Sequence, residues 1–291
     1  MTMGKRDKLQ YSKALIVLST PSVGGKASDG VSDGVKLYSR SVVFAKVSPT
    51  GVVDSHHMIH PSIIYEDKNF IVVNKPAGLP VHAGGAVKGE TLVGWLVKKY
   101  PEIKSVGDDP KIRPGIVHRL DKETSGVMVV ARTQESFEAL KHLFKTRQVA
   151  KKYFALVKGR IAKKSGVIEL PIGTLKTHGV KRTVFAKHAK NIKAAVTAFR
   201  VLERFPDSTL VEVLPKTGRM HQIRVHFAAI GHPVLGDRLY GGAAAREAGL
   251  SRQFLHASSL SFSYPEGRRF TFEASLPEDL KEILKGLRKR R

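Results

Sequence analysis

The succession of many short strand-like segments and few helices constrains the fold of this chain most. Strands, with alternating apolar residues or short β-branched runs, are predicted at residues 63–76 (two strands around a polar turn), 127–131, 153–157 and 209–214. Apolar residues at helical spacing predict helices at residues 91–100, 133–145 and 220–230. Turns rather than regular helical crossovers join most of the strands. We therefore predict an α+β fold with a mixed, largely antiparallel central sheet and flanking helices and loops.

Length and composition are those of a globular protein. The 291 residues are 42% hydrophobic and 26% charged, which is close to ordinary values for folded domains. No apolar run approaches the roughly 18 residues of a membrane-spanning helix, so we expect no membrane association. The chain contains no cysteine, which excludes disulfides, thiol catalysis and cysteine-ligated metal centres.

The charge balance points to a polyanionic partner. Fifty Lys and Arg residues against 25 Asp and Glu residues give a formal net charge of +25. Residues 141–160 contain seven basic residues and no acidic one, and residues 174–193 contain six, again without an acid. A single basic run is usually a solvated face. Several such runs, interleaved with Phe144, Tyr153 and Phe185, favour contact with RNA.

The densest group of charged and small residues lies at 113–126, directly before the predicted strand at 127–131, and reads RPGIVHRLDKETSG. A carboxylate at the rigid entrance to a strand, such as Asp121 beside Arg119, can act as a nucleophile or a base. An isolated Arg-Leu-Asp is usually a surface turn that contains an ion pair. The residue types alone therefore leave both interpretations open.

This segment resembles the catalytic signature of the RluA-type pseudouridine synthases, in which His118 to Asp121 is followed by Thr124 to Gly126. Further blocks occur in the order of that family at residues 73–79, 151–153, 217–226, 231–237 and 255–257. The resemblance extends from about residue 63 to residue 284. It implies the pseudouridine synthase fold, and an isomerase that converts uridine in RNA to pseudouridine without a cofactor.

The resemblance also implies roles for individual residues. Asp121 is then the catalytic aspartate, which acts on the ribose of the target nucleotide as a nucleophile or a base. Tyr153 is the active-site tyrosine near the base, and Arg224 is the basic residue that pairs with the aspartate. Arg119 corresponds to the arginine that helps to displace the target base from its helix. The residues expected to bind the substrate are Arg119, His118, Leu255, Arg219 and Lys152.

The first sixty residues differ from the rest, because they are rich in Ser, Gly and Val and show little apolar periodicity. We interpret residues 1–60 as a poorly defined basic segment or a degenerate RNA-binding module, and residues 61–291 as the catalytic domain. The basic start lacks the apolar stretch and the cleavage site of a secretory signal. We expect a monomeric, cytoplasmic protein, with import into an organelle left open.

Other chemistries fit the residues less well. His221 and His226 would lie about 140° apart on a helix, so they would not bind one metal ion together, and we expect no metal site. Asp121 and Glu123 suggest a glycosidase, but such enzymes need one carboxyl group to keep its proton, which neighbouring cations disfavour.

The main alternative is a non-catalytic RNA-binding or ribosome-assembly protein of the same fold. The presence of Asp121, Tyr153 and Arg224 in their expected motifs favours the enzyme. The high charge favours ribosomal RNA over tRNA as the substrate.

Overall fold

The computed structural model describes residues 60–83, 89–175, 181–184, 187, 189–242, 249–264 and 267–290, and the backbone of residues 42–47. Ten strands of this part of the chain form the main sheet: β1 (Val42–Val47), β2 (Ser62–Glu66), β3 (Phe70–Lys75), β4 (Ser125–Ala131), β5 (Ala150–Lys158), β6 (Ser165–Glu169), β10 (Val196–Arg204), β11 (Ser208–Pro215), β12 (Leu255–Ser263) and β13 (Arg269–Ala274). A smaller sheet contains β7 (Ile172–Leu175), β8 (Arg182–Thr183) and β9 (Ala189–Lys193). The helices are α1 (Leu92–Lys99), the 3-10 helix η1 (Pro101–Ser105), α2 (Gln134–Lys145), α3 (Gln222–Ala229) and α4 (Glu278–Lys289).

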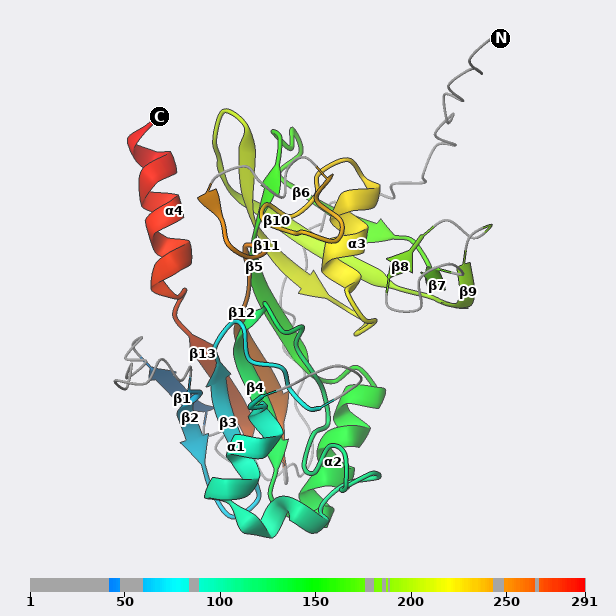
Figure 1. Ribbon diagram of the computed structural model, residues 1–291, viewed down its shortest axis with the longest axis vertical. Coiled ribbons are helices and arrows are strands. Elements are labelled where there is room, and N and C mark those ends of the chain that lie inside the picture. The colour runs from blue at the N-terminus through cyan, green and yellow to red at the C-terminus, as the bar shows by residue number, and fades with distance from the viewer. Residues whose placement is uncertain are drawn as a thin grey trace, which may run out of the picture.

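The main sheet has the strand order β2-β3-β4-β12-β5-β11-β10-β6, and β13 lies between β12 and β1. Among the described strands, the pairs β4–β12 and β1–β13 are parallel and the other pairs are antiparallel. In Figure 1 the sheet extends through the whole length of the molecule, with α1 and α2 beside one half and α3 and α4 beside the other. This confirms the predicted α+β fold with a mixed, largely antiparallel sheet.

The helices begin where the sequence places capping residues. The hydroxyl of Thr91 accepts a hydrogen bond from the backbone N–H of Gly94 at 3.0 Å, directly before α1. Thr133 and Ser136 form a reciprocal capping box at the start of α2. These local hydrogen bonds explain why both helices start close to the predicted positions.

Helices cover both faces of the sheet, and β4 explains how the sequence encodes this. All seven residues of β4 are buried. Val127 and Val129 face the core that contains α2, whereas Met128 and Val130 face the core that contains α1. Successive side chains of a strand point to opposite faces, so a continuous apolar run is what a strand covered on both sides requires.

The other half of the sheet is covered in the same way. Ala155 and Val157 of β5 pack in the core that contains α3, and Leu156 between them packs against α4. Tyr153 of the same strand contacts the core with α1 and the core with α3. It therefore lies where the two halves of the sheet meet.

Gly126 allows β4 and β12 to approach each other at this junction. The residue has a φ of +123°, and it pairs with Ala257 in the parallel ladder. A Cβ atom at this position would lie 2.1 Å from the carbonyl oxygen of Ala257. Only glycine fits, because it tolerates the positive φ and has no side chain.

Most of the predicted N-terminal segment at residues 1–60 lies outside the described residues. The backbone of β1 is described, and it adds a strand to the edge of β13, with Val42 opposite Arg269 and Val47 opposite Ala274. No described helix is long and apolar enough to cross a membrane.

Candidate active site

The loop that carries Asp121 is fixed from one side by a buried lysine. Lys75 is fully buried, and its ammonium group donates to the carbonyl oxygens of Pro76 at 2.7 Å, Leu79 at 2.8 Å and Lys122 at 3.0 Å. Burial lowers the pKa of Lys75 to about 7. In the charged form the three carbonyl groups satisfy all three donors, so the ammonium group connects the end of β3 to the backbone next to Asp121.

A second buried cation fixes the other end of the loop. Arg252 donates to the carbonyl oxygen of Glu123 at 3.2 Å, and its guanidinium group forms two hydrogen bonds with Asp279 of α4, at 2.7 and 3.0 Å. The side chain of Gln253 donates to the hydroxyl of Thr124 at 2.9 Å. The loop is therefore held between β3 and the segment that precedes β12.

Arg224 of α3 joins Asp121 to a second carboxylate. Its Nη1 atom lies 2.8 Å from Oδ2 of Asp121, and its Nε and Nη2 atoms donate to Asp237 at 2.7 and 2.8 Å. The side chain of Asp237 is fully buried, and its Oδ1 also accepts from the backbone N–H groups of Leu239 and Tyr240. The bidentate pair with Asp237 fixes the plane of the guanidinium group. The remaining Nη1 donor is therefore directed at Asp121, whose side chain is 20% exposed.

An aromatic ring and a histidine complete the surroundings of this ion pair. The guanidinium group of Arg224 lies 5.1 Å from the ring centroid of Tyr240, whose hydroxyl accepts from the backbone N–H of Arg182. The same hydroxyl lies 2.8 Å from Nδ1 of His221, and burial lowers the pKa of His221 to about 4. The ring is therefore neutral at pH 7. If the hydroxyl donates to Nδ1, the proton of His221 is on Nε2, which faces Asp121 at 3.8 Å.

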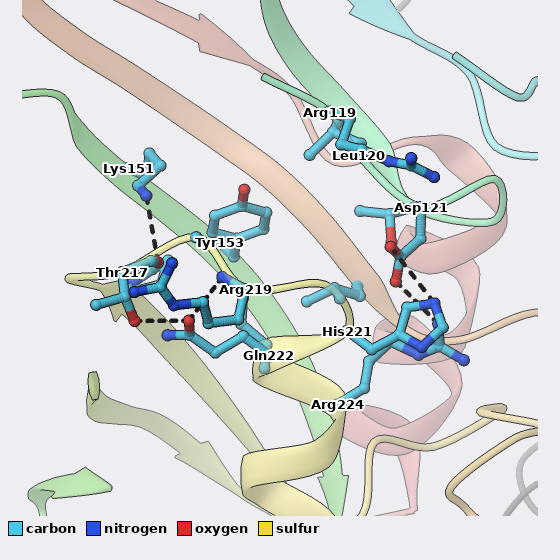
Figure 2. A pocket seen from close by; sticks show the side chains of 15 residues that line it. Arg119, Leu120, Asp121, Lys151, Tyr153, Thr217, Arg219, His221, Gln222 and Arg224 are labelled. Atoms are coloured by element: carbon cyan, nitrogen blue, oxygen red, sulfur yellow. Dashed lines mark hydrogen bonds and ion pairs between the residues drawn. The ribbon is translucent and has the colours of Figure 1, made fainter. Parts of the chain in front are cut away.

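Tyr153, Leu255 and Asp121 line a small cavity of about 90 Å³. Figure 2 shows the ring of Tyr153 between Lys151 and Asp121. Burial, and to a smaller degree the charge of Asp121, raises the pKa of Tyr153 above its usual range. Tyr153 is therefore a neutral phenol, and its hydroxyl has no hydrogen-bond partner among the described residues. The lining of the pocket thus combines a carboxylate, a phenol and an apolar side chain, which suit a planar ligand with polar edges.

A larger cleft of about 490 Å³ adjoins this pocket. The two cavities share Arg119, Lys151, Tyr153, Thr217, Gly218 and Arg219. The described lining of the cleft contains basic residues and no acidic residue: His82, Arg113, His118, Arg119, Lys145, Arg147, Lys151, Lys216 and Arg219. Such a lining fits a chain of phosphate groups, because each Lys or Arg can neutralise one phosphate charge.

The predicted substrate-binding residues take different positions around the two cavities. Leu255 lines the pocket with Asp121, and Arg119 and Arg219 line both cavities. Arg219 also donates to the carbonyl oxygen of Ala194 at 3.1 Å, whereas Arg119 is exposed and forms no ion pair with a described residue.

His118 mainly connects the loop that carries Asp121 to its neighbours, and it is only partly exposed. Its Nε2 atom accepts a hydrogen bond from the backbone N–H of Val129 at 3.1 Å, and its ring stacks on Phe144 with a centroid distance of 4.5 Å. Burial and the nearby charge of Lys151 lower the pKa of His118 to about 3. The neutral ring therefore connects the loop to β4 and α2, with one edge in the cleft.

Lys152 does not line either cavity, and the lysine that does is Lys151. Lys152 is exposed. Residues two apart on a strand share a face, so Lys151 and Tyr153 point into the site and Lys152 points away. The alternation of β5 could have indicated this from the sequence.

The sequence-based list also lacks residues that the structure places around Asp121. Asp237 follows the glycine of the block at residues 231–237, and nothing in the local pattern identifies Arg224 as its partner. Tyr240 and His221 approach Arg224 and Asp121 only through tertiary packing. The one signal in the sequence is that Asp237 ends the apolar segment 233–237. A carboxylate that is buried there needs a cationic partner.

Comparisons with known proteins identify the family of this chain. The family model described as RNA pseudouridylate synthase matches residues 69–229. An uncharacterized RNA pseudouridine synthase of Mycobacterium bovis is 43% identical over 230 residues, which cover 78% of this chain and 73% of that protein. The ribosomal large subunit pseudouridine synthase D of Buchnera aphidicola is 34% identical over 298 residues, which cover 97% of this chain and 91% of that protein.

A solved structure, that of human RNA pseudouridylate synthase domain containing 1, matches with a TM-score of 0.62 and 28% identity, over 79% of this chain and 95% of that one. The chain therefore belongs to the RNA pseudouridylate synthase family. It is an isomerase that acts on RNA and converts uridine to pseudouridine. The family, the fold and the class of reaction predicted from the sequence are confirmed.

Proposed function

We propose that this protein isomerises specific uridines in structured RNA, in ribosomal RNA rather than tRNA, and that Asp121 acts at the ribose of the target nucleotide. The observation that carries the proposal is the ion pair between Asp121 and Arg224, at 2.8 Å, at the mouth of a pocket with Tyr153 on its wall. A carboxylate held in one orientation can act on the sugar, while the pocket retains the detached base. The reaction is an isomerisation, so it needs no redox cofactor.

Tyr153 and Arg119 have separate roles in this proposal. A neutral phenol can stack on the uracil ring and share a proton with it. The target base must leave its stack, at a cost of a few kcal/mol. Arg119 is exposed and lines both cavities, which supports a role in filling the gap that the base leaves.

The choice of ribosomal RNA rests on a relative and on charge. The Buchnera aphidicola protein, which matches nearly the whole chain, is named for the ribosomal large subunit. The net charge of +25 suits a large folded RNA, whose phosphates surround the target on several sides.

The direct test is to map pseudouridine in total RNA from cells with and without the protein, and then in RNA treated with the purified protein. We expect loss of one or a few sites in the large ribosomal RNA, and their restoration by the wild-type protein. Loss of pseudouridine only from tRNA would contradict ribosomal RNA as the substrate. The absence of any site in both experiments would favour the non-catalytic RNA-binding alternative.

We also propose that residues 61–291 carry the chemistry and that the preceding segment adds contacts to RNA. Because β1 pairs with β13, the informative deletion is of residues 1–41. The shortened protein should still modify a short RNA that contains the target, with weaker binding to long RNA. Inactivity on the short RNA would move the domain boundary towards the N-terminus.

The protein is further proposed to act as a monomer in the cytoplasm. The absence of cysteine fits a reducing compartment, and one chain completes the pocket around Asp121. Light scattering should give a mass near 32.0 kDa, and a fluorescent fusion should be distributed through the cytoplasm. A dimer mass, or a fusion confined to an organelle, would contradict this proposal.

A further inference from the structure

Lys151 occupies the junction between the pocket with Asp121 and the adjoining cleft. It lies on β5 two residues before Tyr153, and it is one of the residues that line both cavities. Figure 2 shows its side chain on the far side of Tyr153 from Asp121. Its side chain therefore borders the space where the two cavities meet.

The ammonium group of Lys151 forms no ion pair with a carboxylate of the described residues. Its one hydrogen bond to a described residue is a long one, 3.4 Å to the carbonyl oxygen of Thr217. The side chain is half-buried, and burial alone lowers its pKa to about 8. A desolvated ammonium group without a carboxylate is costly for a folded protein, so an anion supplied by a ligand would remove this cost.

The groups that face Lys151 favour an anion at the same place. His118 and Tyr153 lie beside it as neutral rings, since the pKa of His118 is lowered and that of Tyr153 is raised. The fixed cations around the cleft are Arg113, Arg119, Lys145, Arg147, Lys216 and Arg219. Among the described residues, the one carboxylate that lines the adjoining pocket is that of Asp121, which is paired with Arg224.

We propose that Lys151 binds the RNA phosphate next to the target uridine, at the junction between the two cavities. The target nucleotide then lies in the pocket with Asp121, and the flanking nucleotides remain in the cleft. This inference rests on the proposed function, because it names a contact of the same substrate. Lys151 is a substrate-binding residue and takes no part in breaking or forming bonds.

The contact makes RNA binding dependent on pH. A phosphate beside the amine stabilises its charged form, so binding takes up a proton when the free amine is neutral. The dissociation constant should therefore be nearly constant below about pH 8 and rise above it, approaching tenfold per pH unit. Lys151→Arg keeps its charge at every accessible pH, so its dissociation constant should rise much less above pH 8 than that of the wild type.

The experiment uses a short ribosomal RNA fragment containing a uridine that the wild-type protein modifies. A single methylphosphonate replaces the phosphate on either the 5′ or the 3′ side of that uridine and removes its charge. Lys151→Met should weaken binding of the unmodified RNA about tenfold or more. One of the two methylphosphonates should weaken the wild type similarly but have little further effect on Lys151→Met.

Lys152→Met is the matched control, since it removes the same group from the opposite face of β5. It should bind nearly as the wild type and respond fully to the methylphosphonate. A Lys151→Met variant with wild-type affinity would overturn the proposal. It would also be overturned if, for both methylphosphonates, the loss of affinity were as large in Lys151→Met as in the wild type. A rise of the dissociation constant above pH 8 that is as steep in Lys151→Arg as in the wild type would also overturn it. If the wild type forms no pseudouridine in any RNA, the proposed function fails instead.

Discussion

The Nη1 atom of Arg224 lies 2.8 Å from Oδ2 of Asp121, while the other donors of the same guanidinium group bind the buried Asp237. The carboxylate that the solvent can reach is thus oriented by a cation that the protein interior holds in place. The two paired residues are 103 positions apart in the chain. This arrangement allows the proposed catalytic contribution of each group to be measured separately from its contribution to stability.

Asp121→Asn keeps the size of the side chain and removes its charge. If the carboxylate acts at the ribose, single-turnover formation of pseudouridine should fall by roughly a thousandfold or more, while the affinity for RNA changes little. Glu123→Gln is the control, because it removes a charge from the same loop outside the pocket and should retain activity. Pseudouridine formation by Asp121→Asn at the wild-type rate would exclude the proposed mechanism.

Arg224→Met should abolish most activity, because Asp121 loses the group that orients it. It should also lower stability by about 3–5 kcal/mol, since it leaves Asp237 charged, buried and unpaired. The double variant Arg224→Met/Asp237→Asn should recover part of this stability in a urea titration but none of the activity. Recovery of activity together with stability would show that Arg224 acts only through the fold.

Gly126→Ala should destabilise the protein strongly, because the new Cβ would lie 2.1 Å from the carbonyl oxygen of Ala257 in the β4–β12 ladder. Gly267→Ala provides the comparison. Gly267 also has a positive φ, of +79°, but a Cβ atom there would meet nothing within 4 Å. It should cost only the backbone strain of about 1–2 kcal/mol. Equal melting temperatures of the two variants would contradict the close approach of the strands.

Lys145 and Lys141 should contribute differently to RNA binding, although both belong to one basic run. Lys145 lines the cleft and forms no ion pair with a described residue, whereas Lys141 binds Asp108 at 2.5 Å and Glu138 at 3.3 Å. Lys145→Ala should therefore lower the slope of log affinity against log salt by about 0.7–0.9, the value for one phosphate contact. Lys141→Ala should change this slope less. An equal change of slope in the two variants would indicate that both lysines contact the RNA.

Stability should decline in mild acid because several buried histidines are neutral in the folded protein. Burial lowers the pKa of His118 to about 3 and those of His221, His226 and His256 to about 4. Unfolded histidine titrates at about 6.5, so below this pH the unfolded chain binds protons that the folded chain excludes. The stabilisation is complete above about pH 6.5 and is lost progressively towards pH 4.

Urea titrations at several pH values between about 7.5 and 4.5 measure this decline. They are best done at high salt, which screens the general repulsion within a chain of net charge +25. The urea concentration at the midpoint of unfolding should fall each time the pH is lowered. A level or rising midpoint between pH 6.5 and 4.5 would show that these rings are not held in the neutral form.

The sequence by itself determined the family, the fold class and most of the regular elements. The helix starts at Thr91 and Thr133 and the buried strand at 127–131 follow from hydrogen bonds and side-chain patterns that span a few residues. Such local signals act in the same way wherever the segment lies in the fold. The resemblance of residues 113–126 to a known signature made Asp121 the predicted catalytic residue for a similar reason, since the motif is continuous.

Only the tertiary structure decided how the site is assembled. That Arg224 is oriented by Asp237, that Lys75 and Arg252 hold the two ends of the Asp121 loop, and that Lys151 rather than Lys152 reaches the pocket are consequences of strand order, register and helix packing. These contacts join residues from distant parts of the chain. Their partners are selected by which faces of the sheet are buried together, and no local pattern of residues contains that information.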